Sequence, residues 1–235
     1  MLDDADWSAF AVHIEALEPG HRQVLAQRWS AAALAEHASV ASFARFTLQL
    51  LAVGAPPALL IDAHRAGLDE VEHARLSFRI ASHFAGQPLG PGPLPIPTSG
   101  PVSLREATRA AVLEGCIAET LAAHEARRAA ERCVDPLLRA VLARIAEDEG
   151  RHAELAWAFA GWALRVGGEA VRAGAAQAAE AALEAARRES NVSPGAVEPH
   201  DLAAWGVLPD PERRALAEAH LADTIRPGLA SLFGP

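Results

Sequence analysis

Two ten-residue segments of this chain are almost copies of each other, and they constrain its fold more than any other feature. The first, DEVEHARLSF, covers residues 69–78, and the second, DEGRHAELAW, covers residues 148–157. Both follow the pattern Asp-Glu-x-x-His-Ala-x-Leu-x-aromatic. Residues three apart lie on the same face of a helix, so the glutamate and the histidine of each segment can bind one metal ion together. The repeat therefore predicts two helices that each carry half of a metal site.

Each repeat supplies one glutamate and one histidine at equivalent positions. The four residues are Glu70, His73, Glu149 and His152. A single Glu-x-x-His match is weak evidence, because such matches arise often by chance. The segment from Glu18 to His21 has the same spacing, but Pro and Gly occupy its centre. We expect that segment not to be helical and set it aside.

An aspartate precedes the glutamate in both repeats, at Asp69 and Asp148. Such a carboxylate can accept the second ring N–H of a ligand histidine and so fix its tautomer. We therefore interpret both aspartates as supports behind the ligand histidines. The alternative interpretation is that the repeats are solvated polar pairs on the surfaces of two amphipathic helices.

The rest of the chain is also helical by pattern. Pro and Gly residues and capping sequences divide it into four long helices, at about 21–53, 57–84, 103–133 and 136–167, with a short helix before them and two after them, at about 5–17, 169–189 and 210–233. Ser103 with Glu106 is a capping box, and Asp135 followed by Pro136 is typical of a helix start. We expect an all-α fold.

The lengths of the connections predict the topology. Short turns join the first long helix to the second and the third to the fourth, which is typical of antiparallel hairpins. Residues 86–101 are rich in Pro and Gly, and as polyproline II they could span about 50 Å, against about 45 Å for a long helix. The sequence thus predicts a four-helix bundle of two hairpins with one long crossover. A disordered linker is the alternative for this segment.

A dinuclear carboxylate site needs one more glutamate from each of two further helices. Counting residues from the expected turns places Glu36 level with Glu70, and Glu119 level with Glu149. Glu114 lies about 7.5 Å further along the axis and remains an alternative to Glu119. Cys116 is three residues before Glu119, and it is either a small core residue or part of an active-site wall.

Composition bounds the protein class. We expect a single domain over residues 1–235, with a bundle at 21–166 and a helical extension at 167–235.

The formal net charge of −9 argues against nucleic acid as a partner, and no apolar run is long enough to span a membrane. Two cysteines without a CxxC pattern favour a cytoplasmic location. The absence of tyrosine excludes a tyrosyl radical on this chain.

With these motifs in this order, residues 25–165 resemble the ferritin-like di-iron carboxylate superfamily, and the chain is similar to small bacterial ferritin-like domain proteins. The resemblance implies two bridging glutamates, two terminal glutamates and two terminal histidines, with an aspartate behind each histidine. By this resemblance the bridging glutamates would be Glu70 and Glu149, and the terminal glutamates would be Glu36 and Glu119. The terminal histidines would be His73 and His152, with Asp69 and Asp148 behind them. The chain lacks the cysteines of a complete rubrerythrin and the tyrosine of a reductase subunit.

The function that we expect from this resemblance is a non-haem di-iron oxidoreductase with O₂ as co-substrate. Within that class we expect an oxygenase that acts on a small organic molecule and takes electrons from an external donor. Manganese would suit the same ligands, and a homodimer is left open. The alternatives are a ferroxidase, peroxidase or iron-handling protein without an organic substrate, and a metal-free helical binding module.

Overall fold

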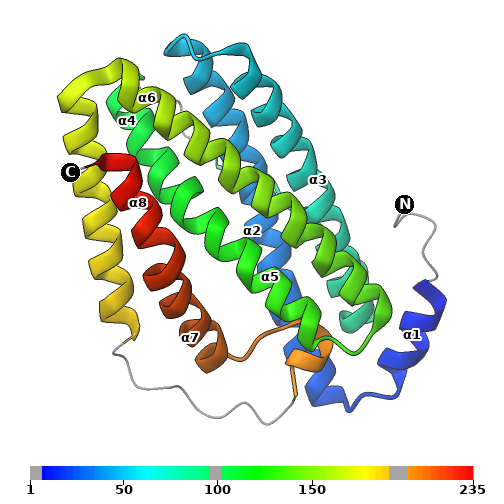
Figure 1. Ribbon diagram of the computed structural model, residues 1–235. Helices are drawn as coiled ribbons and strands as arrows, with labels where there is room; N and C mark the ends of the chain where they lie inside the picture. Colours follow the sequence, from blue (N-terminus) through cyan, green and yellow to red (C-terminus); the bar gives the residue numbers. More distant parts are fainter. Residues whose placement is uncertain (1–6, 96–101, 191–200, 235) are drawn as a thin grey trace.

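The computed structural model describes residues 7–95, 102–190 and 201–234, and within these ranges it is helical without any strand. Four long helical segments lie side by side (Figure 1). They are α2 (Pro19–Ala52), α3 (Pro57–Ala85), a continuous segment made of α4 (Leu104–Ala110), η2 (Ala111–Glu119) and α5 (Thr120–Arg132), and α6 (Pro136–Ser190). The expectation of an all-α protein is confirmed.

Two antiparallel pairings build this arrangement. The closest is between α2 and α3, which are joined by a tight turn in which Gly54 has a φ of 66° and Ala55 N–H donates to the Leu50 carbonyl at 2.9 Å. The second pairs α4, η2 and α5 with α6. The Asp135 carboxylate begins α6 as expected, because its Oδ1 accepts the N–H groups of Leu137 and Leu138 at 2.9 and 3.0 Å.

The two pairings are connected between opposite ends of the helices. Helix α3 ends at Ala85, whereas α4 begins near the opposite end, beside the α2–α3 turn (Figure 1). Ser103 caps α4 as expected, with Glu106 N–H donating to its Oγ at 3.2 Å. Of the predicted crossover at 86–101, residues 96–101 lie outside the described part of the chain, so its path there is not described.

The four long helical segments differ from the expectation at two points. Helix α2 already begins at Pro19, because proline in a first turn removes an N–H that needs no partner there. Glu18 is extended, but the expectation that the segment to His21 is not helical was wrong for residues 19–21. The third helix contains nine residues of π-helix, Ala111–Glu119, which no sequence signal indicated. The break predicted near Gly168 is present, with φ 67° and ψ −163°, and the chain reverses there (Figure 1).

The remaining elements cover the ends and one side of the bundle. Helix α1 (Trp7–Glu15) buries its aromatic face against α3, while α7 (Asp210–His220), η4 (Leu221–Ile225) and α8 (Arg226–Phe233) lie beside α5 and the last part of α6. A short segment with the 3-10 helix η3 (Ala203–Trp205) precedes α7. No described helix is long and apolar enough to cross a membrane. The division into a bundle at 21–166 and an extension at 167–235 stays a prediction.

Candidate metal centre

Four helical segments bring the six predicted ligand residues to one place inside the bundle. They form two overlapping sets, and in each set one carboxylate oxygen or ring nitrogen from every residue lies within 4.8 Å of those of the others. The first set is Glu36, Glu70, His73 and Glu149, and the second is Glu70, Glu119, Glu149 and His152. Glu70 and Glu149 belong to both sets. We refer to the six residues as the carboxylate cluster.

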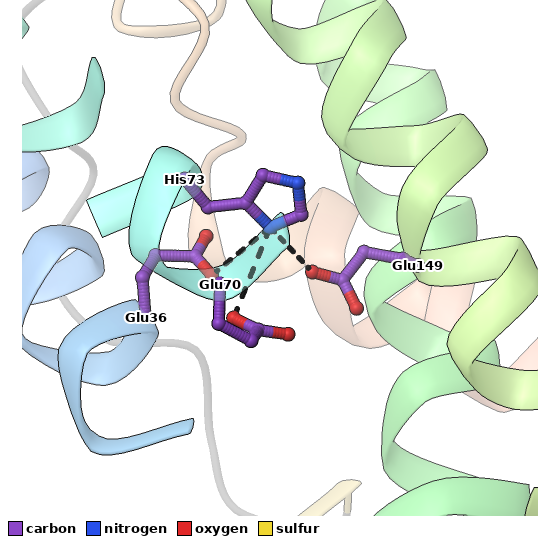
Figure 2. Close-up of side chains that lie close together, drawn as sticks. All are labelled: Glu36, Glu70, His73 and Glu149. Carbon is purple, nitrogen blue, oxygen red and sulfur yellow. Dashed lines mark ion pairs between the residues drawn. The ribbon is translucent and has the colours of Figure 1, made fainter. Parts of the chain in front are cut away.

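His73 lies at the centre of the first set. Figure 2 shows its ring facing three glutamates that come from α2, α3 and α6. Its Nδ1 lies 3.6 Å from Glu36 Oε2, 3.8 Å from Glu70 Oε2 and 3.4 Å from Glu149 Oε1. The His73 side chain is fully buried, and 1% of Glu70 is exposed. The two repeats are thus brought together on facing helices.

His152 has the equivalent position in the second set. Its Nδ1 lies 3.1 Å from Glu70 Oε1 and 3.4 Å from Glu149 Oε2. Glu119 reaches this set from the π-helix η2, and the ring of Phe43 packs edge-on against His152 with the ring centroids 5.0 Å apart. Each histidine therefore directs the same ring nitrogen at both shared glutamates.

Several buried atoms of the carboxylate cluster lie within ion-pair distance of one another but have no hydrogen bond of normal geometry. They are both carboxylate oxygens of Glu70, one oxygen of Glu149, and the Nδ1 atoms of His73 and His152. A buried polar group without a hydrogen bond costs about 1–3 kcal/mol, so these five atoms are only partly satisfied by their mutual ion pairs. Cations between the two sets would contact these atoms, so the residues present fit a pair of metal ions.

The two aspartates support the histidines in a crossed arrangement. Asp148 Oδ2 lies 3.0 Å from the Nε2 of His73, and Asp69 Oδ2 lies 3.4 Å from the Nε2 of His152. Each aspartate thus serves the histidine of the other repeat and leaves that histidine's Nδ1 directed into the carboxylate cluster. Arg151 forms ion pairs with both aspartates. The sequence suggested the role of the aspartates but not the crossing.

Burial and mutual attraction shift the pKa values of the carboxylate cluster strongly. Burial raises the pKa of Glu70 to about 7, and burial together with the Glu149 carboxylate raises the pKa of Glu119 to about 11. Burial by itself would lower the histidine pKa values, but the surrounding carboxylates outweigh it and raise that of His73 to about 11 and that of His152 to about 9. The same histidines lower the pKa of Glu149 despite its burial. The groups therefore balance one another's charge through shared protons, which cations would displace.

The two candidate glutamates of the third helix occupy different places. Glu119 joins the carboxylate cluster, whereas Glu114 is exposed and pairs with Arg45 of α2. In a π-helix the repeat is longer than in an α-helix, so residues five apart share a face. Glu114 and Glu119 consequently line one cavity of about 40 Å³ between α2, η2 and α6. Cys116 is fully buried in an apolar group with Val112 and does not line either cavity beside the carboxylate cluster.

Two cavities adjoin the carboxylate cluster, both along the seam where α2 faces the third helical segment. The smaller, of about 40 Å³, reaches Glu119 and His152. The larger, of about 420 Å³, reaches Glu36 and Glu149 and is bounded by residues 206–208. Ser77 lines the larger cavity, 1% exposed and with its hydroxyl unpaired. Ser77 lies four residues after His73, so this spacing could have indicated that Ser77 lines the cavity. No sequence signal pointed to residues 206–208.

Comparison of the chain with family models, with curated proteins and with solved structures finds no match of any of the three kinds. The likeness to the ferritin-like superfamily therefore rests on the repeated motif and on the carboxylate cluster that it forms.

Proposed function

We propose that this protein is a ferritin-like, non-haem di-iron oxidoreductase that activates O₂ and oxygenates a small organic substrate. The observation that carries the proposal is that two ligand sets share two glutamates, Glu70 and Glu149, and have one histidine each. Such an arrangement matches two metal ions with bridging carboxylates. A mononuclear site would need only one of the two sets, and a solvated polar pair would need neither.

The donor set suits two divalent cations. Glu36 and His73 would complete the coordination of one ion, and Glu119 and His152 that of the other. Four carboxylates carry four negative charges once deprotonated, which balance two divalent cations in a buried place. Carboxylate and imidazole ligands suit iron and also manganese. We propose iron because O₂ is the proposed co-substrate.

The roles of the chain's own residues follow from their contacts. The metal pair, when bound, would supply the redox chemistry with O₂, and an external donor would supply electrons. Asp148 and Asp69 hold the histidine rings by accepting from Nε2. Phe43 and the surrounding apolar side chains cover the His152 side of the carboxylate cluster. Glu119 and His152 face the small cavity, which offers a path for a small molecule such as O₂.

The larger cavity favours an oxygenase over an iron-handling protein. Its volume of about 420 Å³ lies within the range of small-molecule sites, and part of its lining belongs to the carboxylate cluster. A ferroxidase or peroxidase without an organic substrate needs no cavity of this size. A metal-free binding module is disfavoured for a different reason, because it would leave the buried cluster atoms permanently without hydrogen bonds of normal geometry.

Metal analysis tests the proposal directly. Protein purified from iron-supplemented cells should hold about two irons per chain. Glu70→Ala and Glu149→Ala should each lose both irons together, since each residue contributes to both sets. Glu72→Ala on α3 and Glu147→Ala on α6 are matched controls, because neither residue belongs to the carboxylate cluster, and both should keep the metal. The proposal would be contradicted if the parent protein held no metal and if Glu70→Ala and Glu149→Ala were both as stable as the parent.

An anaerobic Fe(II) titration followed by O₂ separates the oxygenase from the iron-handling alternative. The oxygenase should consume O₂ in proportion to an added organic substrate and a reductant, with substrate carbon oxidised. Oxidation of Fe(II) alone, in proportion to iron and unaffected by organic molecules, would instead support a ferroxidase.

A further inference from the structure

The exposed large apolar side chains are concentrated on one pair of helices. Of the nine that are exposed in the described part of the chain, six belong to α2 and α3. We refer to these six residues as the hairpin face, and their exposed fractions run from 51% to 71%. They are Leu34, Leu48, Leu51, Ile61, Leu68 and Val71. We propose that the hairpin face is the interface of a homodimer, with a second copy of this chain as its partner.

The hairpin face is directed away from the interior of the bundle. Leu34 and Leu48 are fourteen residues apart, close to four helical turns, and Ile61 and Leu68 are seven apart, close to two. The other two members follow three residues after Leu48 and Leu68. Leu34 and Leu68 each lie two residues before a glutamate of the carboxylate cluster, a rotation of about 200° around the helix. Each helix therefore has an apolar stripe on the side opposite its cluster glutamate.

A groove of about 530 Å³ joins the two stripes. Its lining includes His37 of α2, three residues after Leu34, and Val71 of α3, so the stripes open onto the same hollow. Residues 89–91 also line this groove. The hairpin face thus combines protruding side chains with a hollow between them. In a two-fold dimer the same surface is used by both copies, so the protruding side chains of one copy can enter the groove of the other.

The apolar area of the hairpin face matches the need of a stable dimer. At about 30 Å² for each exposed carbon group, the six side chains expose roughly 400–500 Å². A standard interface buries about 800 Å² on each partner, of which about 65% is apolar in homodimers, so about 500 Å² of apolar surface is needed. The hairpin face is therefore large enough to form one such interface without a contribution from another side of the molecule.

The charges around the hairpin face favour a second copy over a partner of opposite charge. On α3, Arg65 pairs with Asp62 at 3.3 Å and Arg75 pairs with Glu72 at 2.7 Å, and Arg45 of α2 is paired as well. The chain has a formal net charge of −9, so two copies repel each other in general. A face whose charges are balanced within each copy adds no local repulsion when two copies meet.

A lipid surface fits the hairpin face less well. Helices that lie on membranes carry basic residues around their apolar face, and these residues attract anionic lipids. The three arginines beside the hairpin face are instead held by carboxylates, and the net charge of the chain is negative. These observations leave the second copy as the occupant.

Analytical ultracentrifugation of the full chain tests the proposal. The parent protein should sediment with twice the 24.7 kDa mass of one chain. Leu68→Asp and Leu48→Asp should each raise the dissociation constant of the dimer at least about hundredfold, because a carboxylate without a partner would be buried in both copies. Both side chains are exposed in the single chain, so the variants should keep the parent's helical circular dichroism.

Val12→Asp on α1 and Val166→Asp on α6 are the matched controls. Both valines are also exposed but lie outside the hairpin face, and both variants should sediment as the parent does. A parent protein that stays monomeric at every concentration would overturn the proposal. A dimer that survives both leucine substitutions would overturn it too, since the contact would then lie elsewhere.

Two further measurements test the nature of the contact. An apolar interface should persist in 1 M NaCl, where exposed charge pairs are screened, so dissociation of the dimer by salt would contradict the proposal. Cosedimentation with phosphatidylcholine vesicles, with and without phosphatidylserine, tests a lipid occupant. Vesicle binding by a monomeric parent that Leu68→Asp abolishes would assign the hairpin face to lipid and overturn the dimer.

The inference goes beyond the proposed function and is tested separately from it, because no residue of the hairpin face belongs to the carboxylate cluster. A dimer that depends on Leu48 and Leu68 in a chain that never takes up metal would support the interface and contradict the di-iron function. Two irons in each chain of a monomeric protein would do the reverse.

Discussion

The Nε2 atom of His73 lies 3.0 Å from Oδ2 of Asp148, a residue of the other repeat. The equivalent contact, from His152 to Asp69, is 3.4 Å. The repeats therefore hold each other's histidines, and the geometry of each half of the carboxylate cluster depends on the packing of α3 against α6. Because Asp148 is buried whereas 23% of the Asp69 side chain is exposed, the two contacts are not equivalent in strength.

Asparagine in place of Asp148 should weaken metal binding more than the same change at Asp69. Loss of an acid behind a ligand histidine commonly costs about 10–100-fold in metal affinity, and the shorter, buried contact should lie toward the upper end of that range. Competition with a chelator of known affinity measures this. Equal affinities for Asp148→Asn, Asp69→Asn and the parent would show that the contacts do not support the histidines.

Metal uptake should release protons and weaken in acid. The raised pKa values of His73, His152 and Glu119, about 11, 9 and 11, mean that these groups hold protons near neutral pH when no cation is present. A metal ion binds only their deprotonated forms, so protons compete with it and apparent affinity should rise with pH. Calorimetry in two buffers with different ionisation enthalpies counts the protons. Affinity that does not vary with pH would contradict the charge balance described for the cluster.

Alanine at Gly115 should destabilise the protein, because η2 and α6 approach too closely there for a side chain. A Cβ at this position would lie 2.2 Å from the Cβ of Ala156, and the resulting overpacking should lower the free energy of unfolding by about 1–3 kcal/mol. Gly150 of α6 is the matched control, since a Cβ there would meet nothing within 4 Å. Gly150→Ala should raise the free energy of unfolding by about 0.5–1 kcal/mol. Urea unfolding compares the two variants, and equal effects would contradict the close approach.

Neither cysteine should react with a thiol reagent at about pH 8 in the folded protein. Burial raises the pKa of Cys116 to about 12 and that of Cys133 to about 11, so both stay as thiols, whereas the thiolate is the reactive form. Both should react rapidly after unfolding in guanidinium chloride, which is the control. Fast modification of the native chain, measured with a chromogenic disulfide, would place a cysteine at an accessible position.

The amino-acid pattern alone determined the helices and the residue types of the carboxylate cluster. Helix starts at Pro57, Ser103 and Asp135 follow from local capping chemistry, and the break near Gly168 follows from the conformational freedom of glycine. Counting along regular helices also placed Glu119 rather than Glu114 in the carboxylate cluster. These features depend on neighbours close in sequence, and a helix has a fixed rise per residue.

Tertiary packing decided the features that join distant segments. The crossing of Asp148 to His73 and of Asp69 to His152 depends on the rotation of α3 against α6, which a one-dimensional pattern does not encode. The larger cavity depends on residues 206–208 reaching Trp29 from far along the chain, and on alanines of two helices that face each other. Sequence periodicity shows which face of a helix is apolar, but only the packed bundle shows whether that face meets a side chain or an open space.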